Sequence, residues 1–294
     1  MTKQYLISFC NNKKNIHAQT NLIAQLEVDL NAQKASLIDL PLIMPSDLKG
    51  NGVTGMCFHK GQLVLLLQRM PSTLVFFDDD FKFSHYFELT GLKGVHSILS
   101  RGGFIYLSVT NQDRIVKVND ENQQFDVWSN ETLEDTIHLN SICIHNNELY
   151  ASAFGKKANE LWSSAQSGYV FRVLDGKKVI DNIWHPHSSF SYDNQIFCCN
   201  SSKQQIISEE GVYQADYPGY TRGLYIDDDL LICGASLGRL VSHSTGLRIS
   251  NKSDQGVLAG ECGITVNFKN SQVTQFLSLS QCATEIFDVL PIRD

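Results

Sequence analysis

The sequence of 294 residues lacks a long apolar run. No stretch approaches the roughly 18–20 apolar residues that a membrane-spanning helix needs, which excludes a helical membrane protein. The first ten residues contain too short an apolar run for a secretory signal peptide. We therefore expect a cytoplasmic protein that does not bind membranes.

Basic residues are also scarce: 24 Lys and Arg stand against 31 Asp and Glu, for a net charge of −7. Because non-specific nucleic-acid binding needs a basic surface, the composition disfavours a nucleic-acid partner. Hydrophobic residues make up 43% and charged residues 19%, as in ordinary globular proteins. The length suffices for a large core in one or two domains. The repeat described below favours a single domain, residues 1–294.

Several catalytic and metal-binding motifs are absent. The eight cysteines include no CxxC pair, so we expect buried, reduced thiols. No Gly-x-Ser-x-Gly motif is present, which disfavours a serine hydrolase. Residues 234–239 resemble a phosphate-binding loop only superficially, because its lysine and a following helix are missing. Any function must therefore come from residues that the fold brings together.

What the sequence does contain is a repeat. A polar residue, then Gly or Ser, then alternating apolar residues and a turn recur at intervals of 42, 44, 47 and 35 residues. A repeat of roughly 40–50 residues made of short strands is typical of a β-propeller. The polar residues are Thr54, His96, Asn140, His187 and Arg222.

A second strand follows each of these turns, and a sixth copy of it stands near the start of the chain. The copies are residues 62–67, 104–109, 148–153, 195–200, 230–235 and 4–9. The copy at residues 4–9 lacks an innermost strand, and an unpaired strand edge needs a partner. We expect residues 285–289 to pair with it. The sequence thus predicts an all-β, six-bladed propeller whose C-terminal strand closes the first blade.

The repeated polar residues predict a site. One position in each innermost strand of a propeller faces the central channel, so these side chains should form a ring. Closure of the first blade adds Glu285 as the sixth member. Imidazoles, an amide, a guanidinium and a carboxylate in one ring are more typical of a binding site than of a plug.

The chain also resembles an uncharacterised bacterial family of six-bladed propellers, known only as a domain of unknown function. The resemblance covers roughly residues 90–291, and its motifs occur in the family's order. They are Val95-His96, His138-Leu139-Asn140, Pro186-His187-Ser188, Arg222-Gly223-Leu224 after Pro218-Gly219, Cys262-Gly263 and the run at 285–289. The family's usual arginine after Pro-His-Ser-Pro is missing, since Ser189 and Phe190 stand there. The resemblance supports the fold and the site but implies no reaction.

The catalytic candidates are His96, His187 and Glu285. Imidazole titrates near neutral pH and suits general acid–base catalysis. Alternatively, each histidine satisfies backbone groups in the channel. Glu285 and the two histidines with Asn140 could also hold a divalent metal. This mixed set suits calcium poorly, and no spacing indicates zinc, manganese or iron, so a metal cofactor stays open.

The remaining candidates would bind substrate. Arg222 could hold a carboxylate or phosphate with its planar fork, or form an ion pair with Glu285 or Asp288. His138 and His185 each precede a ring position by two residues, so they should extend the site towards its entrance. Asn140, Thr54 and Ser236 complete the predicted substrate-binding set.

Two long loops, residues 154–168 and 236–262, should cover one face, where Trp162 and Trp184 either stack on a ligand or pack in the loops. Two hypotheses follow. In one, the channel binds a small polar anion and converts it by histidine acid–base chemistry, as in a lyase, isomerase or hydrolase. In the other, the propeller is a scaffold for protein partners. The oligomeric state stays open.

Overall fold

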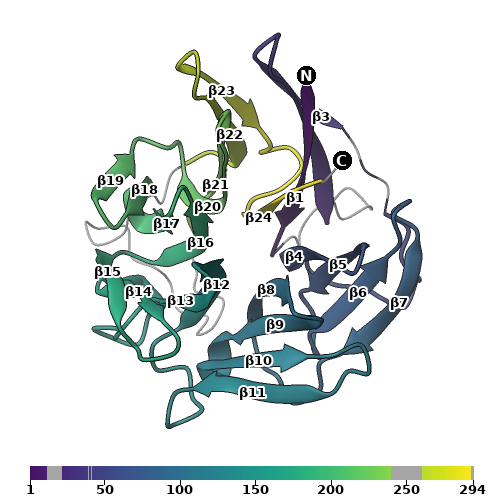
Figure 1. The fold of residues 1–294 in the computed structure, drawn as a ribbon, viewed down its shortest axis with the longest axis vertical. Helices are drawn as coiled ribbons and strands as arrows, with labels where there is room; N and C mark the ends of the chain where they lie inside the picture. Colours follow the sequence, from purple (N-terminus) through teal and green to yellow (C-terminus); the bar gives the residue numbers. More distant parts are fainter. Residues whose placement is uncertain (12–21, 39, 41, 240–259, 293–294) are drawn as a thin grey trace.

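Six four-stranded sheets are arranged around a common axis, as Figure 1 shows in a view down the short axis of the molecule. The structure is a computed structural model that describes residues 1–11, 22–38, 40, 42–239 and 260–292. Within these ranges there is no α-helix, only three short 3-10 turns at Thr110–Gln112, Trp162–Ser164 and Ser201–Lys203. No helix in the described ranges is long and apolar enough to cross a membrane.

Each blade has its innermost strand next to the channel. Blade 1 comprises β24 (Ile286–Pro291), β1 (Thr2–Phe9), β2 (Ile23–Asp29) and β3 (Lys34–Ile38). Blade 2 comprises β4 (Val53–His59), β5 (Gln62–Leu67), β6 (Thr73–Phe77) and β7 (Phe83–Glu88). Blade 3 comprises β8 (Val95–Arg101), β9 (Phe104–Val109), β10 (Arg114–Val118) and β11 (Gln124–Ser129).

The other three blades follow in chain order. Blade 4 comprises β12 (Leu139–His145), β13 (Glu148–Ala153), β14 (Gly168–Arg172) and β15 (Lys178–Ile183). Blade 5 comprises β16 (Pro186–Tyr192), β17 (Gln195–Asn200), β18 (Gln205–Ser208) and β19 (Gly211–Gln214). Blade 6 comprises β20 (Tyr220–Ile226), β21 (Leu230–Ser236), β22 (Gly263–Phe268) and β23 (Val273–Ser278).

The predicted closure is confirmed. Strand β24 pairs antiparallel with β1, with Leu6 opposite Leu290 and Ile7 opposite Val289. The two strands lie side by side in Figure 1, so the first blade is assembled from both ends of the chain. The strand begins one residue later than predicted, at Ile286, and ends two residues later, at Pro291.

The apolar core is divided into separate clusters, one at each of the six interfaces between neighbouring blades. The cluster between blades 1 and 6, for example, joins Tyr5 and Ile7 to Leu230, Ile232 and Ile264. Second strands such as β5 are almost wholly buried, whereas the outer strand β7 alternates between half-buried and exposed residues. Because the blades pack through their faces, the channel is left for polar side chains.

Every innermost strand has an irregular register at or next to the ring position, and in β24 this position is held by Phe287 and not by Glu285, which precedes the strand. The register shifts between Val53 and Met56 in β4, and the other five innermost strands shift at the equivalent place. A β-bulge bends a strand and re-aims its side chains. Gly223, beside Arg222, has a φ of 69°, which a residue without Cβ adopts without steric cost.

Side chains at these bulges connect one blade to the next. The Ser141 hydroxyl accepts a hydrogen bond from the Ser189 backbone N–H at 2.9 Å, and the Ser188 hydroxyl accepts one from Gly223 N–H at 2.8 Å. The Asp288 carboxylate accepts a hydrogen bond from Met56 N–H at 3.1 Å. We call these three contacts the inter-blade clips.

The closing strand should be essential for stability. Ile286 is fully buried in the cluster between blades 1 and 6, so Ile286→Ala should lower the free energy of unfolding by about 2–4 kcal/mol. In urea unfolding, the matched change Val273→Ala on the outer strand β23 should cost about 0.5 kcal/mol or less. Equal losses in the two variants would contradict the role given to β24.

Candidate functional site

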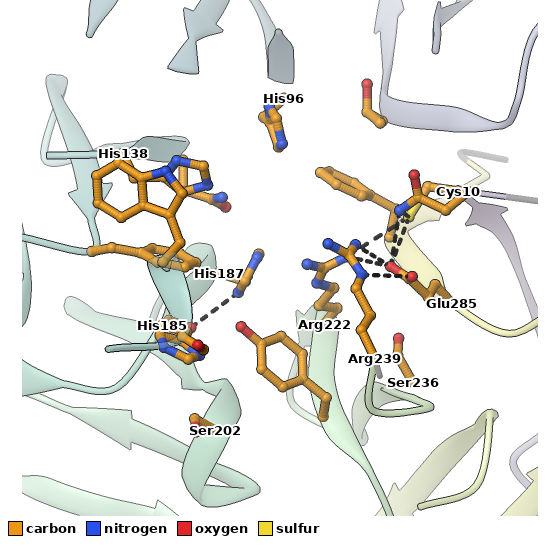
Figure 2. A pocket seen from close by; sticks show the side chains of 18 of the residues that line it. Cys10, His96, His138, His185, His187, Ser202, Arg222, Ser236, Arg239 and Glu285 are labelled. Carbon is orange, nitrogen blue, oxygen red and sulfur yellow. Dashed lines mark hydrogen bonds and ion pairs between the residues drawn. The ribbon is translucent and has the colours of Figure 1, made fainter. Parts of the chain in front are cut away.

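All nine predicted site residues line one cavity of 330 Å³ in the channel. Figure 2 shows His96 and His187 directed into this cavity, with Arg222, Arg239 and Glu285 across from them. Five of these residues lie on the innermost strands of blades 2 to 6, three lie just before an innermost strand, and Ser236 ends the second strand β21. The nine residues are Thr54, His96, His138, Asn140, His185, His187, Arg222, Ser236 and Glu285.

Two of the nine have hydroxyls that are already engaged by the backbone. Thr54 Oγ1 donates to the Val95 carbonyl at 3.0 Å. Ser236 Oγ donates to the Ile286 carbonyl at 3.2 Å and accepts from Ile286 N–H at 3.0 Å. These contacts favour structural roles, and the prediction that both bind substrate stays untested.

The hydrogen bonds of His96 and His187 fix the tautomer of each ring. His96 Nδ1 lies 2.9 Å from the Gly94 carbonyl oxygen, and His187 Nδ1 lies 3.0 Å from the His185 carbonyl oxygen. Because a carbonyl oxygen can only accept, Nδ1 carries the proton and Nε2 keeps a lone pair. Burial lowers the pKa of His96 to about 4 and that of His187 well below its ordinary value. Both rings are therefore neutral at physiological pH.

His138 has a carboxylate partner instead. Its Nδ1 lies 3.1 Å from Asp135 Oδ1, and Asp135 Oδ2 also accepts a hydrogen bond from Trp162 Nε1 at 3.1 Å. The long loop at 154–168 thus contributes to the site, as expected, through Trp162. Residues 240–259 of the other long loop lie outside the described residues. Because a carboxylate only accepts, Nδ1 of His138 carries a proton and donates it to Asp135, which fixes the orientation of the ring.

Aromatic rings form one wall of the cavity. The His185 ring stacks on Phe154 with centroids 5.0 Å apart, and burial lowers the pKa of His185 to about 4. The His138 ring packs against Trp162 at 4.5 Å, and Tyr220 packs edge-on against His187 at 5.4 Å. Trp184 does not line the cavity but lies under Lys203.

The opposite wall is cationic. Glu285 accepts hydrogen bonds from Arg222 at 3.1 Å, from Arg239 Nε at 2.7 Å and from Asn11 at 3.0 Å. The two guanidiniums hold the pKa of Glu285 down to about 2 although burial alone would raise it. Two cations share one carboxylate, so this wall has a net positive charge. The arrangement favours Glu285 as a counter-ion, and the catalytic role predicted for it stays untested.

Arg222 is positioned but not saturated. Its guanidinium lies between the rings of Tyr220 and Phe287, 5.2 and 5.5 Å from their centroids. Its Nε is buried and has no hydrogen-bond partner among the described residues, and neither has Nδ2 of Asn140. Unpaired buried donors are costly, and these two belong to side chains that line the cavity.

The donor set fits a metal poorly. No group of three His, Cys, Asp or Glu side chains in the described ranges is placed to hold a metal ion. Glu285, the one carboxylate among the four predicted ligands, is engaged by two arginines and Asn11. We therefore derive no chemistry through a metal.

Sequence reasoning missed several residues that complete the site. Arg239 lies just after β21, in the segment rejected as a phosphate loop. Asp135 precedes His138 by three residues, a spacing that could have drawn attention to it. Phe287 lines both halves of the channel at the bulge of β24. Tyr220 and Phe154 resemble ordinary core residues in sequence, so no signal distinguished them.

Residues 80–294 match the sequence profile of a family described as domain of unknown function (DUF4915). The match spans most of the chain, so the chain belongs to that family. A search of curated proteins gives no match.

Solved structures share the fold. A chain of a nidogen/laminin complex has a TM-score of 0.63 at 10% identity, covering 99% of this chain and 98% of the other. A Bacteroides caccae protein of unknown function has a TM-score of 0.59 at 10% identity, and the match covers 99% of this chain and 100% of the other. A presumed 6-phosphogluconolactonase from Bacteroides fragilis has a TM-score of 0.52 at 11% identity, and the match covers 99% of this chain and 98% of the other. At these identities the likeness shows only the propeller fold.

The neutral histidines should make the protein sensitive to acid. His96 and His185 have folded-state pKa values of about 4, below the unfolded value of 6.5. The unfolded chain therefore binds protons first, and stability is lost as pH falls from 6.5 towards 4. Each histidine contributes up to about 3 kcal/mol to this loss. Urea unfolding of His185→Gln should show a shallower loss than the wild type, whereas parallel pH curves would contradict the assignment.

Glu285 should be essential for holding the two arginines. Glu285→Gln leaves the buried Arg222 and the half-buried Arg239 without a counter-ion and should lower the free energy of unfolding by about 3 kcal/mol. The matched change Glu148→Gln breaks a surface pair with Arg172 and should cost at most about 1 kcal/mol. Chemical denaturation measures both, and a loss for Glu285→Gln no larger than the control would overturn the counter-ion role.

Proposed function

We propose that this member of the family of unknown function binds a small hydroxylated anion in the 330 Å³ cavity and transfers protons to or from it through imidazole side chains. The observation that carries the proposal is the pairing of a net positive wall with neutral imidazoles in one cavity. The positively charged wall would bind the anionic group of the ligand. The neutral imidazoles would bind and deprotonate its hydroxyl groups.

The anionic end of the ligand would lie against Arg222. The buried Nε of Arg222 has no partner among the described residues, and Arg239 adds a second guanidinium beside it. A guanidinium matches a carboxylate or phosphate oxygen pair through two parallel hydrogen bonds. Glu285 would keep both guanidiniums in place by neutralising one of the two charges.

The hydroxyl groups of the ligand would lie against the histidines. In the neutral tautomer described above, Nε2 of His96 and of His187 can only accept a hydrogen bond. These atoms suit ligand hydroxyls, which can donate. The aromatic wall of Phe154, Trp162 and Tyr220 provides an apolar surface for the carbon skeleton. The site is therefore matched to an organic acid that carries hydroxyl groups, such as a sugar acid.

Proton transfer would follow from the same geometry. A neutral imidazole next to a bound hydroxyl or an acidic C–H can act as a general base. Asp135 would stabilise the positive charge that His138 gains when it takes up a proton. Lyase, isomerase and hydrolase reactions all use such a step, and the proposal does not choose among them.

The test is calorimetric titration of the protein with gluconate, a hydroxylated monoanion, and with glucose, its uncharged counterpart. We expect gluconate to bind and glucose to bind at least about tenfold more weakly, because a charged hydrogen bond is worth about 1.5–3 kcal/mol. Arg222→Ala should weaken gluconate binding by a similar factor. Glu285 remains paired with Arg239 in that variant, so the fold should persist.

The control is Arg172→Ala, which removes an arginine on the surface of blade 4 and should leave gluconate binding unchanged. If no hydroxylated acid in a panel of aldonic, uronic and hydroxy acids binds the wild type, the proposal fails and the scaffold hypothesis gains support. Equal affinity for gluconate and glucose would show that the cationic wall does not recognise the anion.

A further inference from the structure

A second cavity of 430 Å³ occupies the other half of the channel. Asn140, His187 and Phe287 line both cavities and therefore mark the boundary between them. Beyond this boundary the wall mixes aliphatic and aromatic side chains with a series of hydroxyl groups. The hydroxyls belong to Ser97, Ser100, Ser141, Ser188, Ser189 and Ser191.

Asp288 is the one carboxylate on this wall. Its Oδ2 accepts a hydrogen bond from Met56 N–H at 3.1 Å, which is one of the three inter-blade clips. Its Oδ1 accepts a hydrogen bond from Val289 N–H at 2.9 Å. No lysine or arginine lines the cavity, all of whose lining residues lie in the described ranges. The ion pair with Arg222 that the sequence offered as one alternative is made by Glu285 and not by Asp288. The carboxylate thus has hydrogen bonds but no counter-ion among the residues that the structure describes.

The other two clips are made without a charged side chain. Ser141 and Ser188 accept the equivalent backbone N–H groups with an uncharged hydroxyl, at similar distances. A carboxylate in the same position has to be desolvated, and burial raises the pKa of Asp288 to about 6. Asp288 is half-buried where it lines the cavity, and no lysine or arginine lies beside its carboxylate among the described residues.

The neighbouring titratable groups do not provide a compensating charge. Burial raises the pKa of Cys57 on β4 and Cys143 on β12 and lowers that of His187 on β16, so all three are neutral near pH 8. The residues of β8 and β20 that line this cavity carry no titratable side chain. Above its pKa, Asp288 is therefore the only charge on the wall.

We infer that this second cavity binds a small organic ammonium ion, with the nitrogen at Asp288 and the apolar body against the surrounding aliphatic and aromatic side chains. An ammonium supplies the missing positive charge and donates to the remaining carboxylate lone pairs and to the serine hydroxyls. Phe287 and Phe190 add aromatic surface that favours a cation. A metal ion fits less well, because a single carboxylate in a wide cavity offers too few anionic ligands.

The experiment is calorimetric titration of the full chain at pH 8 with cyclohexylammonium and with uncharged cyclohexanol. We expect the amine to bind and the alcohol to bind at least tenfold more weakly. Between pH 8 and pH 5, amine binding should weaken about tenfold as Asp288 is protonated.

The decisive variant is Asp288→Ser, which copies the hydroxyl clips of blades 4 and 5 and removes the charge together with one of the two accepting oxygens. It should keep the melting temperature of the wild type, keep gluconate binding if the first proposal is correct, and lose at least tenfold in affinity for the amine. If this variant does not fold, Asp288→Asn retains an oxygen that can accept from Met56 N–H and replaces it in the test.

Three results would overturn the inference. The first is unchanged amine binding in the uncharged variant, and the second is equal affinity for cyclohexanol and the amine. The third is one-to-one binding of Ca²⁺ alone that excludes the amine. Because gluconate and the amine are titrated separately, failure at one cavity is distinguishable from failure at the other.

Discussion

The hydrogen-bonded pairing of β24 with β1 is the interaction on which the rest of the structure depends. It closes the ring of blades, and it also delivers three side chains to the channel within four residues. Glu285 holds the two arginines of the first cavity, Phe287 lies at the boundary between the cavities, and Asp288 joins blade 1 to blade 2. Without this pairing neither cavity has a complete wall, so the fold and both proposed sites rest on the same strand.

The fold could be predicted from the sequence because its signals are local and repeated. The strands at residues 62–67, 104–109, 148–153 and 195–200 were predicted with the bounds that the structure shows. Their apolar residues and turn residues recur in each blade, so each copy supports the others. The long-range pairing of β24 could also be predicted. The sequence shows six second strands but only five innermost strands, so the first blade needed a partner from elsewhere in the chain. The start of β24 was missed by one residue, because Glu285 turns into the cavity before the ladder begins.

The site was only partly predictable, for a physical reason. Residues at the ring position share a register, and this register brought His96, Asn140, His187 and Arg222 to one cavity as predicted. Arg239 and Asp135 reach the same cavity from loops, where no periodicity reports the direction of a side chain. The state of each imidazole could not be predicted either. It depends on carbonyl oxygens two residues away and on burial, and both are properties of the folded backbone.

The division of the core into six interface clusters has a consequence for how the protein folds. Neighbouring blades can pack as soon as both have formed, but the cluster between blades 1 and 6 has to wait for contacts separated by more than 200 residues. Closing so long a loop is slow and entropically costly compared with forming hairpins. Partly folded forms could therefore contain well-packed blades while their channel is still open to water. Ligand recognition would then emerge in the last step of folding, so that occupancy of the channel reports a completed ring.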